Sequence, residues 1–134
     1  MLRGVPIEEL QSFLDRANIA VVATLRPDGS VLLSPVWYEW AHGGFNVPSS
    51  TDDVKVRHLS RDPRATIVVA EQTPPYMGVE VRGTATLLHD GAREVTRRIA
   101  ARYDDEAQDD LVIRLMPGRL RTWSFADQYP PSPP

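Results

Sequence analysis

The chain has 134 residues, of which 42% are hydrophobic and 25% charged, and this composition suits a globular protein with one core. It contains no cysteine, which excludes disulfides and thiolate metal sites, and its formal net charge of −3 argues against bulk attraction to nucleic acid. No apolar run is long enough to cross a bilayer, and the first residues lack a signal-peptide pattern. We therefore expect a cytoplasmic protein that binds neither nucleic acid nor membrane.

The first part of the sequence predicts a helix followed by a β-hairpin. Apolar residues recur at helical spacing over residues 7–14. Two apolar runs at 18–25 and 31–40 predict strands, and the turn residues at 26–30 join them. Pro35 cannot donate to a ladder, so we expect it at a sheet edge, at a bulge or where a ligand approaches.

The middle of the sequence predicts a short strand, a helix and a longer strand. Residues 45–47 form the short strand after a glycine turn. Ser50 and Asp53 match the S/T-x-x-D/E capping pattern, so a helix should begin there and run to about residue 61. Residues 65–71 are almost continuously apolar, which is typical of a buried strand.

The last part of the sequence predicts three strands and one helix. Residues 77–89 alternate as a strand does, and Gly83 interrupts the alternation, which indicates a bulge or a barrel corner. Residues 92–103 have the spacing of a helix. Two further strands are expected at 111–115 and 120–125.

These elements predict a mainly β, α+β fold. About six short antiparallel strands with two or three helices form a small barrel, and residues 1–128 make up this single domain. Such a barrel leaves little interior space, so a large planar ligand would lie outside it, most naturally in a dimer groove. The proline-rich residues 129–134 can hold neither a helix nor a ladder, and we expect a disordered tail.

Lys55 is the strongest local candidate for ligand binding. It is the single lysine among 15 basic residues, and it follows Ser49 and Ser50 at the start of a predicted helix. Hydroxyls, free amide groups and a lysine at a helix N-terminus can form a phosphate site. Ordinary capping with a surface charge explains the same pattern, and Asp52 and Asp53 would repel a phosphate. The residues alone leave both interpretations open.

The tryptophans and the missing motifs give weaker indications. Trp37 and Trp40 lie three apart on one predicted strand and would point to opposite faces, so one of them could face a partner or ligand. The sequence has no dinucleotide-binding motif, P-loop or nucleophile elbow, and its histidines lack metal-ligand spacing. We expect no metal and assign no catalytic side chain. This absence is typical of proteins whose cofactor carries the redox chemistry.

Three segments together resemble the pyridoxamine 5′-phosphate oxidase-like superfamily, and most closely its small deazaflavin-dependent reductases, which use coenzyme F420. These are residues 23–30 with 34–38, then 55–64, then 81–85, and residues 119–123 resemble the last strand of that family. The resemblance implies an antiparallel split β-barrel of roughly six strands that forms a homodimer with a cofactor site in each dimer groove. Apolar strand faces that a monomer would expose favour the same dimer.

The resemblance also implies the residues of the cofactor site. The ring would lie along Ser34, Pro35, Val36 and Trp37, and the phosphate would lie near Ser49, Ser50, Lys55 and Arg57. The partner chain would contribute residues near Tyr76. Arg61 lies one helical turn from Arg57, and the two could follow the anionic tail that F420 carries beyond its phosphate. A solvated helix face is the alternative interpretation of these two arginines.

The expected function is the transfer of a hydride from reduced F420 to an unsaturated or quinone-like small molecule. An FMN-dependent oxidoreductase on the same fold is one alternative, because FMN and F420 share a ring-and-phosphate outline. A non-catalytic flavin- or deazaflavin-binding protein is another. The acidic residues Asp52 and Asp53 stand where many relatives place an arginine or a small residue, which bears directly on how tightly the phosphate is held.

Overall fold

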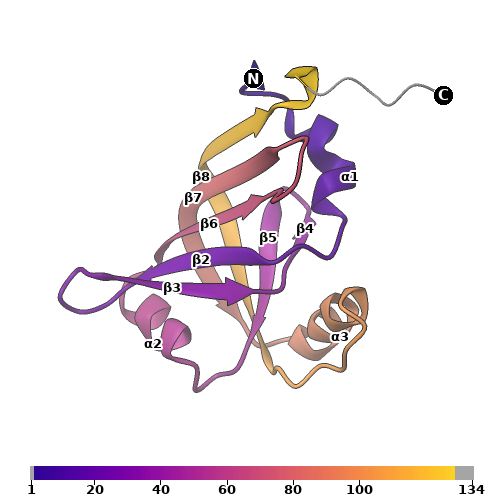
Figure 1. Cartoon of the computed structure of the whole chain (residues 1–134). Coiled ribbons are helices and arrows are strands. Elements are labelled where there is room, and N and C mark those ends of the chain that lie inside the picture. Colours follow the sequence, from indigo (N-terminus) through magenta and orange to yellow (C-terminus); the bar gives the residue numbers. More distant parts are fainter. Residues whose placement is uncertain (1, 129–134) are drawn as a thin grey trace.

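An antiparallel sheet curls into a half-barrel in the computed structural model, which describes residues 2–128 (Figure 1). The strand order is β3-β2-β6-β7-β8-β5-β4, and β1 pairs with β8 outside this path. The strands are β1 (Leu2–Arg3), β2 (Ala20–Leu25), β3 (Val31–Val36), β4 (Glu39–Ala41), β5 (Gly44–Ser49), β6 (Arg64–Ala70), β7 (Met77–Leu88) and β8 (Leu111–Ser124). The α+β split-barrel prediction is confirmed, with seven strands on the main path rather than six. The predicted tail at 129–134 lies outside the described residues.

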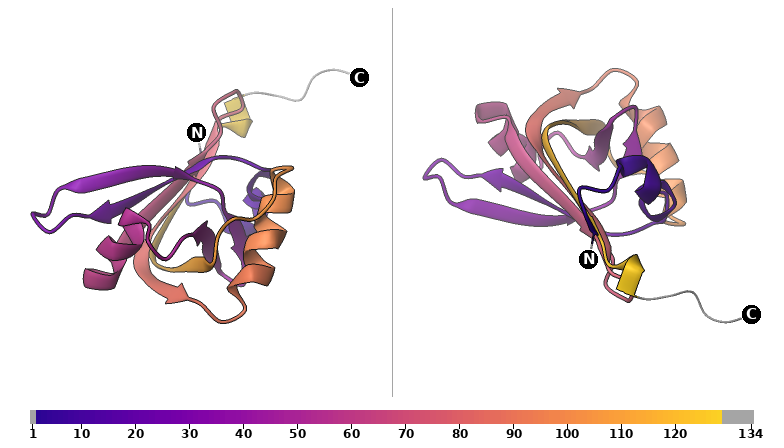
Figure 2. Two further views of the ribbon diagram at one scale, coloured as in Figure 1. Left: turned by 90° about the horizontal axis from the view of Figure 1, so that it is seen from below. Right: turned by 90° about the horizontal axis from the view of Figure 1, so that it is seen from above.

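The helices lie around this sheet. They are η1 (Ile7–Leu10), α1 (Gln11–Leu14), α2 (Val54–Arg61), α3 (Ala92–Arg102) and the short η2 (Ala126–Gln128). The α2 helix lies beside the β2–β3 hairpin, and α3 lies at the other side of the barrel against β5 and β8 (Figure 2). None of the helices between residues 2 and 128 has the length and apolar character needed to span a membrane.

A bulge allows the sheet to bend. The β7 and β8 strands pair from Met77 to Leu88, and their register shifts between Arg82 and Gly83. A Cβ at Gly83 would lie 1.8 Å from the carbonyl oxygen of Met116, so only glycine allows this close approach of the two backbones. The bulge predicted at Gly83 is therefore confirmed.

The two strands predicted at 111–115 and 120–125 are one continuous strand, β8. Pro117 lies between the two predicted segments, and proline cannot donate to a ladder. Its pairing partner is Gly83, at the bulge where the ladder is already irregular. The missing N–H is therefore tolerated at this one position.

The strand predicted at 31–40 is in fact two strands, because the chain leaves the sheet at Trp37 and Tyr38. Side chains of α3 and of the turn after it form hydrogen bonds with the backbone there, in place of a neighbouring strand. The N–H of Tyr38 donates to the Tyr103 hydroxyl at 3.2 Å, and Arg102 Nη1 donates to the Tyr38 carbonyl at 2.8 Å. Trp37 and Trp40 therefore do not share a strand, contrary to the prediction.

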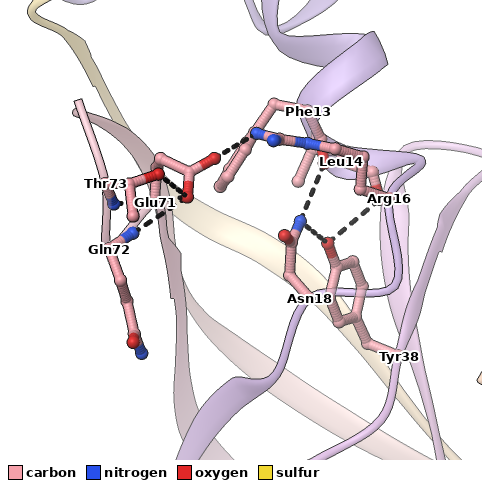
Figure 3. A network of polar contacts seen from close by, with 8 residues as sticks. All are labelled: Phe13, Leu14, Arg16, Asn18, Tyr38, Glu71, Gln72 and Thr73. Atoms are coloured by element: carbon pink, nitrogen blue, oxygen red, sulfur yellow. Dashed lines mark hydrogen bonds and ion pairs between the residues drawn. The ribbon is translucent and has the colours of Figure 1, made fainter. Parts of the chain in front are cut away.

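Polar contacts fasten the N-terminal helix to the sheet (Figure 3). The side chain of Asn18 donates to the Phe13 carbonyl at 2.8 Å and to the hydroxyl of the fully buried Tyr38 at 3.0 Å. Arg16 forms an ion pair with Glu71, which lies just after β6. These contacts tie the segment that follows α1 to the residue after β6 and to Tyr38 between β3 and β4.

A buried carboxylate joins α3 to the strands. Glu39 on β4 is only 7% exposed and accepts hydrogen bonds from Asn46 Nδ2 at 2.9 Å and from Arg98 Nε at 2.9 Å and Nη2 at 2.5 Å. Burial alone would raise the pKa of Glu39. The hydrogen bonds from Arg98 and Asn46 outweigh burial and hold that pKa below its ordinary value of 4.5.

We predict that Glu39→Gln destabilises the protein by about 1–3 kcal/mol at pH 7, because a charge-assisted bidentate contact is lost. The native pKa is lowered, so the contribution is fully present above pH 4.5 and declines as the pH falls below it. Urea unfolding of wild type and variant across this range should show the difference in free energy shrinking towards acid. Glu106→Gln, at an exposed carboxylate, is the control. A difference that stays constant with pH would contradict this role for Glu39.

Candidate functional site

A groove of about 490 Å³ lies where the ends of β3 and β5 meet the start of α2. We call it the Lys55 groove. One part of its lining is apolar, and the other is polar and charged. The apolar part consists of Ile19, Pro35, Val36, Trp37 and Pro48. The polar part consists of Ser49, Asp53, Lys55 and Asp109.

The indole of Trp37 forms a rigid wall of the apolar part. It stacks on the ring of Tyr103, with centroids 4.9 Å apart and planes 9° apart. The Tyr103 hydroxyl in turn donates to the Asn18 carbonyl at 2.6 Å and accepts from the Tyr38 N–H. The wall is therefore fixed before any ligand arrives, and its shape suits a flat aromatic ligand.

The β3 strand brings an open edge to the groove. Among the described strands it pairs only with β2, so its other edge has no ladder partner. Pro35 lies on this edge strand, which confirms one of the positions expected for it. Apart from the Val31 carbonyl, which accepts from Arg26 Nη1 at 2.8 Å, backbone groups on that edge can bind a ligand or a second chain.

Side chains of α2 hold that helix against β2. The buried His58 Nδ1 lies 3.0 Å from the Thr24 hydroxyl, and the Arg61 guanidinium donates to the Leu25 carbonyl at the end of β2. His58 is thus a packing residue of the α2–β2 contact. Arg61 stabilises the hairpin end and does not line the groove.

Asp53 and Lys55 form the charged centre of the groove. Lys55 is 9% exposed, so it is not the surface charge of the simpler interpretation. Its ammonium lies 2.5 Å from Asp53 Oδ2, which also accepts from the Ser49 hydroxyl at 3.2 Å. Burial would raise the pKa of Asp53, but the hydrogen bonds and charge of Lys55 outweigh it and lower that pKa below 3.8.

The N-cap of α2 is Asp53, and the prediction of Ser50 as the cap is wrong. Asp53 Oδ1 accepts from the Lys55 N–H at 3.2 Å, whereas the Ser50 hydroxyl donates to Asp109 at 3.3 Å. An aspartate is as good a cap as a serine, and here it stands directly before the first helical residue. Ser50 is therefore free to bind the loop before β8.

Asp109 and Asp110 are site neighbours that no motif in the sequence indicated. Strand pairing explains their position. Ser49 pairs with Leu111, so the residues just after β5 face those just before β8. Asp110 accepts from the backbone N–H of Thr51 at 3.0 Å and from its hydroxyl at 3.1 Å.

The structure brings together only some of the predicted site residues. Pro35, Val36, Trp37, Ser49 and Lys55 line the groove, and Ser50 lies beside it. Ser34, Arg57, Arg61 and Tyr76 do not line it. Tyr76 packs edge-on against Phe125, with ring centroids 6.4 Å apart, near the loop between β6 and β7. That loop lies at the opposite end of the sheet from α2 (Figure 1).

Solved structures share this fold. An F420 reductase is 24% identical, with 82% of this chain and 94% of that chain covered and a TM-score of 0.72. A conserved hypothetical protein of Mycobacterium tuberculosis is 22% identical over 97% of this chain and 91% of its own, with a TM-score of 0.77. An FAD-binding protein of Mesorhizobium loti is 20% identical over 91% and 96%, with a TM-score of 0.70.

The sequence supplies the assignment to a family, since structural likeness at this identity establishes the fold alone. None of the curated proteins matches the chain. The family model of pyridoxamine 5′-phosphate oxidase matches residues 6–124, which include every strand of the main sheet path and all lining residues of the Lys55 groove. The chain belongs to the pyridoxamine 5′-phosphate oxidase family.

Proposed function

We propose that the protein is an oxidoreductase that binds a flavin-type cofactor in the Lys55 groove. One observation carries this proposal: a fixed aromatic wall and a buried ammonium lie in the same groove, beside an open strand edge. Such a cofactor has a flat ring at one end and a phosphate at the other, and the groove offers a matching surface for each. Neighbours that are an F420 reductase and an FAD-binding protein support the same class of cofactor.

The residues of the groove fit this cofactor in most respects. Trp37, held by Tyr103, would orient the ring, and the edge of β3 would bind its polar atoms through the backbone. Lys55 and Ser49 would hold the phosphate. When bound, the cofactor supplies the hydride chemistry, and the apolar lining keeps water from the ring. The two carboxylates at the polar end fit less well, since they repel a phosphate.

Among the possible cofactors we propose F420, with a hydride passed to an unsaturated or quinone-like small molecule. The F420 reductase among the structural neighbours supports this choice. Arg57 supports it independently, because this exposed arginine has no ion-pair partner within residues 2–128 and could bind the anionic tail. An FMN-dependent oxidoreductase on the same fold is the alternative proposal. The cytoplasmic location stays a prediction from the sequence.

We propose further that the protein works as a homodimer. Ile19, Val31 and Leu33 on and beside the β2–β3 hairpin are 51%, 49% and 64% exposed. These residues form an apolar surface that extends to the groove, since Ile19 also lines it. A second copy of the chain would cover this surface. The same copy would bring a residue such as Tyr76 to the cofactor, which a single chain cannot do.

Titration with F420 and with FMN tests the cofactor. Binding of either ligand should quench the fluorescence of Trp37, and Trp37→Phe should lose that signal.

Added salt should weaken F420 binding more steeply than FMN binding. Arg57→Ala should lower the preference for F420 about two- to fivefold, the size of an exposed charge contact. Arg97→Ala on α3 is the control. If neither ligand binds, the proposed function is wrong. If Arg57→Ala leaves the preference for F420 over FMN unchanged, Arg57 no longer supports the choice of F420.

Lys55→Ala should weaken binding of the phosphate-bearing cofactor and also lower the stability of the protein. Stability should fall by about 1–3 kcal/mol, because the partly buried Asp53 carboxylate loses its counter-ion. Chemical denaturation measures this change. Arg57→Ala removes the same charge two residues along from an exposed position, so its stability should remain that of wild type. Equal stability of both variants would show that the ion pair between Lys55 and Asp53 contributes nothing to stability.

Light scattering at micromolar concentration should show a dimer. Leu33→Glu should convert it to a monomer, because a charge in the centre of the apolar surface cannot be desolvated cheaply. Leu88→Glu changes an equally apolar residue, 40% exposed, at the end of β7 and should leave the dimer intact. A wild-type protein that is a stable monomer would contradict the dimer and the shared site.

A further inference from the structure

We propose that Asp53 is a specificity-determining residue that limits the affinity of the groove for phosphate, an inference that rests on the proposed function of the groove. The carboxylate of Asp53 occupies the position at which the anion-binding groups converge. In consequence, the wild-type groove discriminates weakly between a flavin with a phosphate and the same flavin without one.

The contacts of Asp53 are those that a phosphate would need. Its Oδ2 atom accepts from Lys55 Nζ at 2.5 Å and from Ser49 Oγ at 3.2 Å, and its Oδ1 atom accepts from the Lys55 N–H at 3.2 Å. An ammonium, a hydroxyl and a helix N-terminal amide therefore bind one carboxylate. Asp53, Lys55 and Ser49 all line the groove. The Asp53 carboxylate and an incoming phosphate would therefore compete for the same donor groups.

Capping alone does not require this arrangement. A cap needs one oxygen to accept from the backbone, and asparagine supplies such an oxygen as well as aspartate does. The second oxygen of Asp53 accepts from the Lys55 ammonium and the Ser49 hydroxyl. The negative charge of the carboxylate opposes a phosphate. The capping function and the competing charge can therefore be separated by a single substitution.

A second carboxylate reinforces the effect. Asp109 lines the same groove and accepts from the Ser50 hydroxyl at 3.3 Å, so another predicted phosphate ligand is already engaged by an aspartate. Among residues 2–128, Lys55 is the one cationic side chain that lines the groove, and the same lining holds two carboxylates. A phosphate gains its full contact with Lys55 only when Asp53 is displaced or neutralised.

Asp53→Asn is the test variant, because it retains the cap and removes the charge. Asp52→Asn makes the same change of net charge one residue earlier, at an exposed position outside the groove, and is the matched control. Asp53→Asn combined with Lys55→Ala shows whether any gain acts through Lys55. FMN and riboflavin are the paired ligands, since they differ only by the phosphate. Inorganic phosphate is a probe that needs no ring.

Wild type should bind FMN and riboflavin with similar affinity. Asp53→Asn should raise the preference for FMN by about tenfold, the size of one charge-assisted contact. Asp52→Asn should change it less than twofold, and the double variant should return it to the wild-type value. The inference would be overturned if wild type already preferred FMN to riboflavin tenfold and Asp53→Asn left that preference unchanged. The proposed function would not be affected by this result.

Thermal unfolding in inorganic phosphate, with chloride as the ionic-strength control, decides the inference even if flavins do not bind. Phosphate should raise the unfolding midpoint of Asp53→Asn and leave those of wild type and the double variant unchanged. Failure of every flavin and deazaflavin to bind any variant would reject the proposed function. Failure of phosphate to stabilise Asp53→Asn, or equal stabilisation of wild type, would reject the role of Asp53.

Discussion

The pairing of β7 with β8 is the interaction on which the rest of the structure depends. The β8 strand pairs with β7 along nearly its whole length, with β5 at one end and with β1 at the other. A flat ladder of this length would not close into a half-barrel, and the register shift at Gly83 supplies the bend. Because the Met116 carbonyl would lie 1.8 Å from a Cβ at Gly83, the bend depends on that glycine.

The groove follows from this pairing. The β5 strand ends at Ser49, opposite Leu111, and α2 then carries the chain across to β6. That crossing places Lys55 beside the last residues of β3. The α3 helix and the turn after it fix the other wall, since Tyr103 stacks on Trp37 and Arg102 binds the backbone of Tyr38. The site is thus assembled from the β5–α2 segment, the end of β3 and the end of α3, which are distant in the sequence and are held by one sheet.

The electrostatics of the groove distinguish this chain from a simple anion site. A buried lysine in an apolar groove would require a counter-ion, and Asp53 provides one from the same helix start. This ion pair contributes to the stability of the protein, and under the proposed function it would oppose the cofactor phosphate through the same contacts. Under this proposal, the stability of the protein and the affinity for a phosphate are therefore linked through one carboxylate.

Local signals predicted the features that depend on single residues. Gly83 marked the bulge, Pro35 marked an edge strand, and Lys55 marked the polar end of the groove. Contacts between distant segments could not be predicted in this way. The break at Trp37 depends on groups from α3 and the turn after it, and the position of Asp109 depends on the pairing of β5 with β8. The contact of Ser50 with Asp109, in place of a capping contact on α2, likewise depends on residues far apart in the sequence.

A crystal structure of the wild-type protein with F420 bound tests the central claim most directly. We expect the ring to lie against Val36 and Trp37 and the phosphate to lie within hydrogen-bonding distance of Ser49 and Lys55, with the Asp53 carboxylate moved away from the ammonium. A ring bound elsewhere on the sheet, with the contact between Asp53 and Lys55 intact, would contradict the central claim.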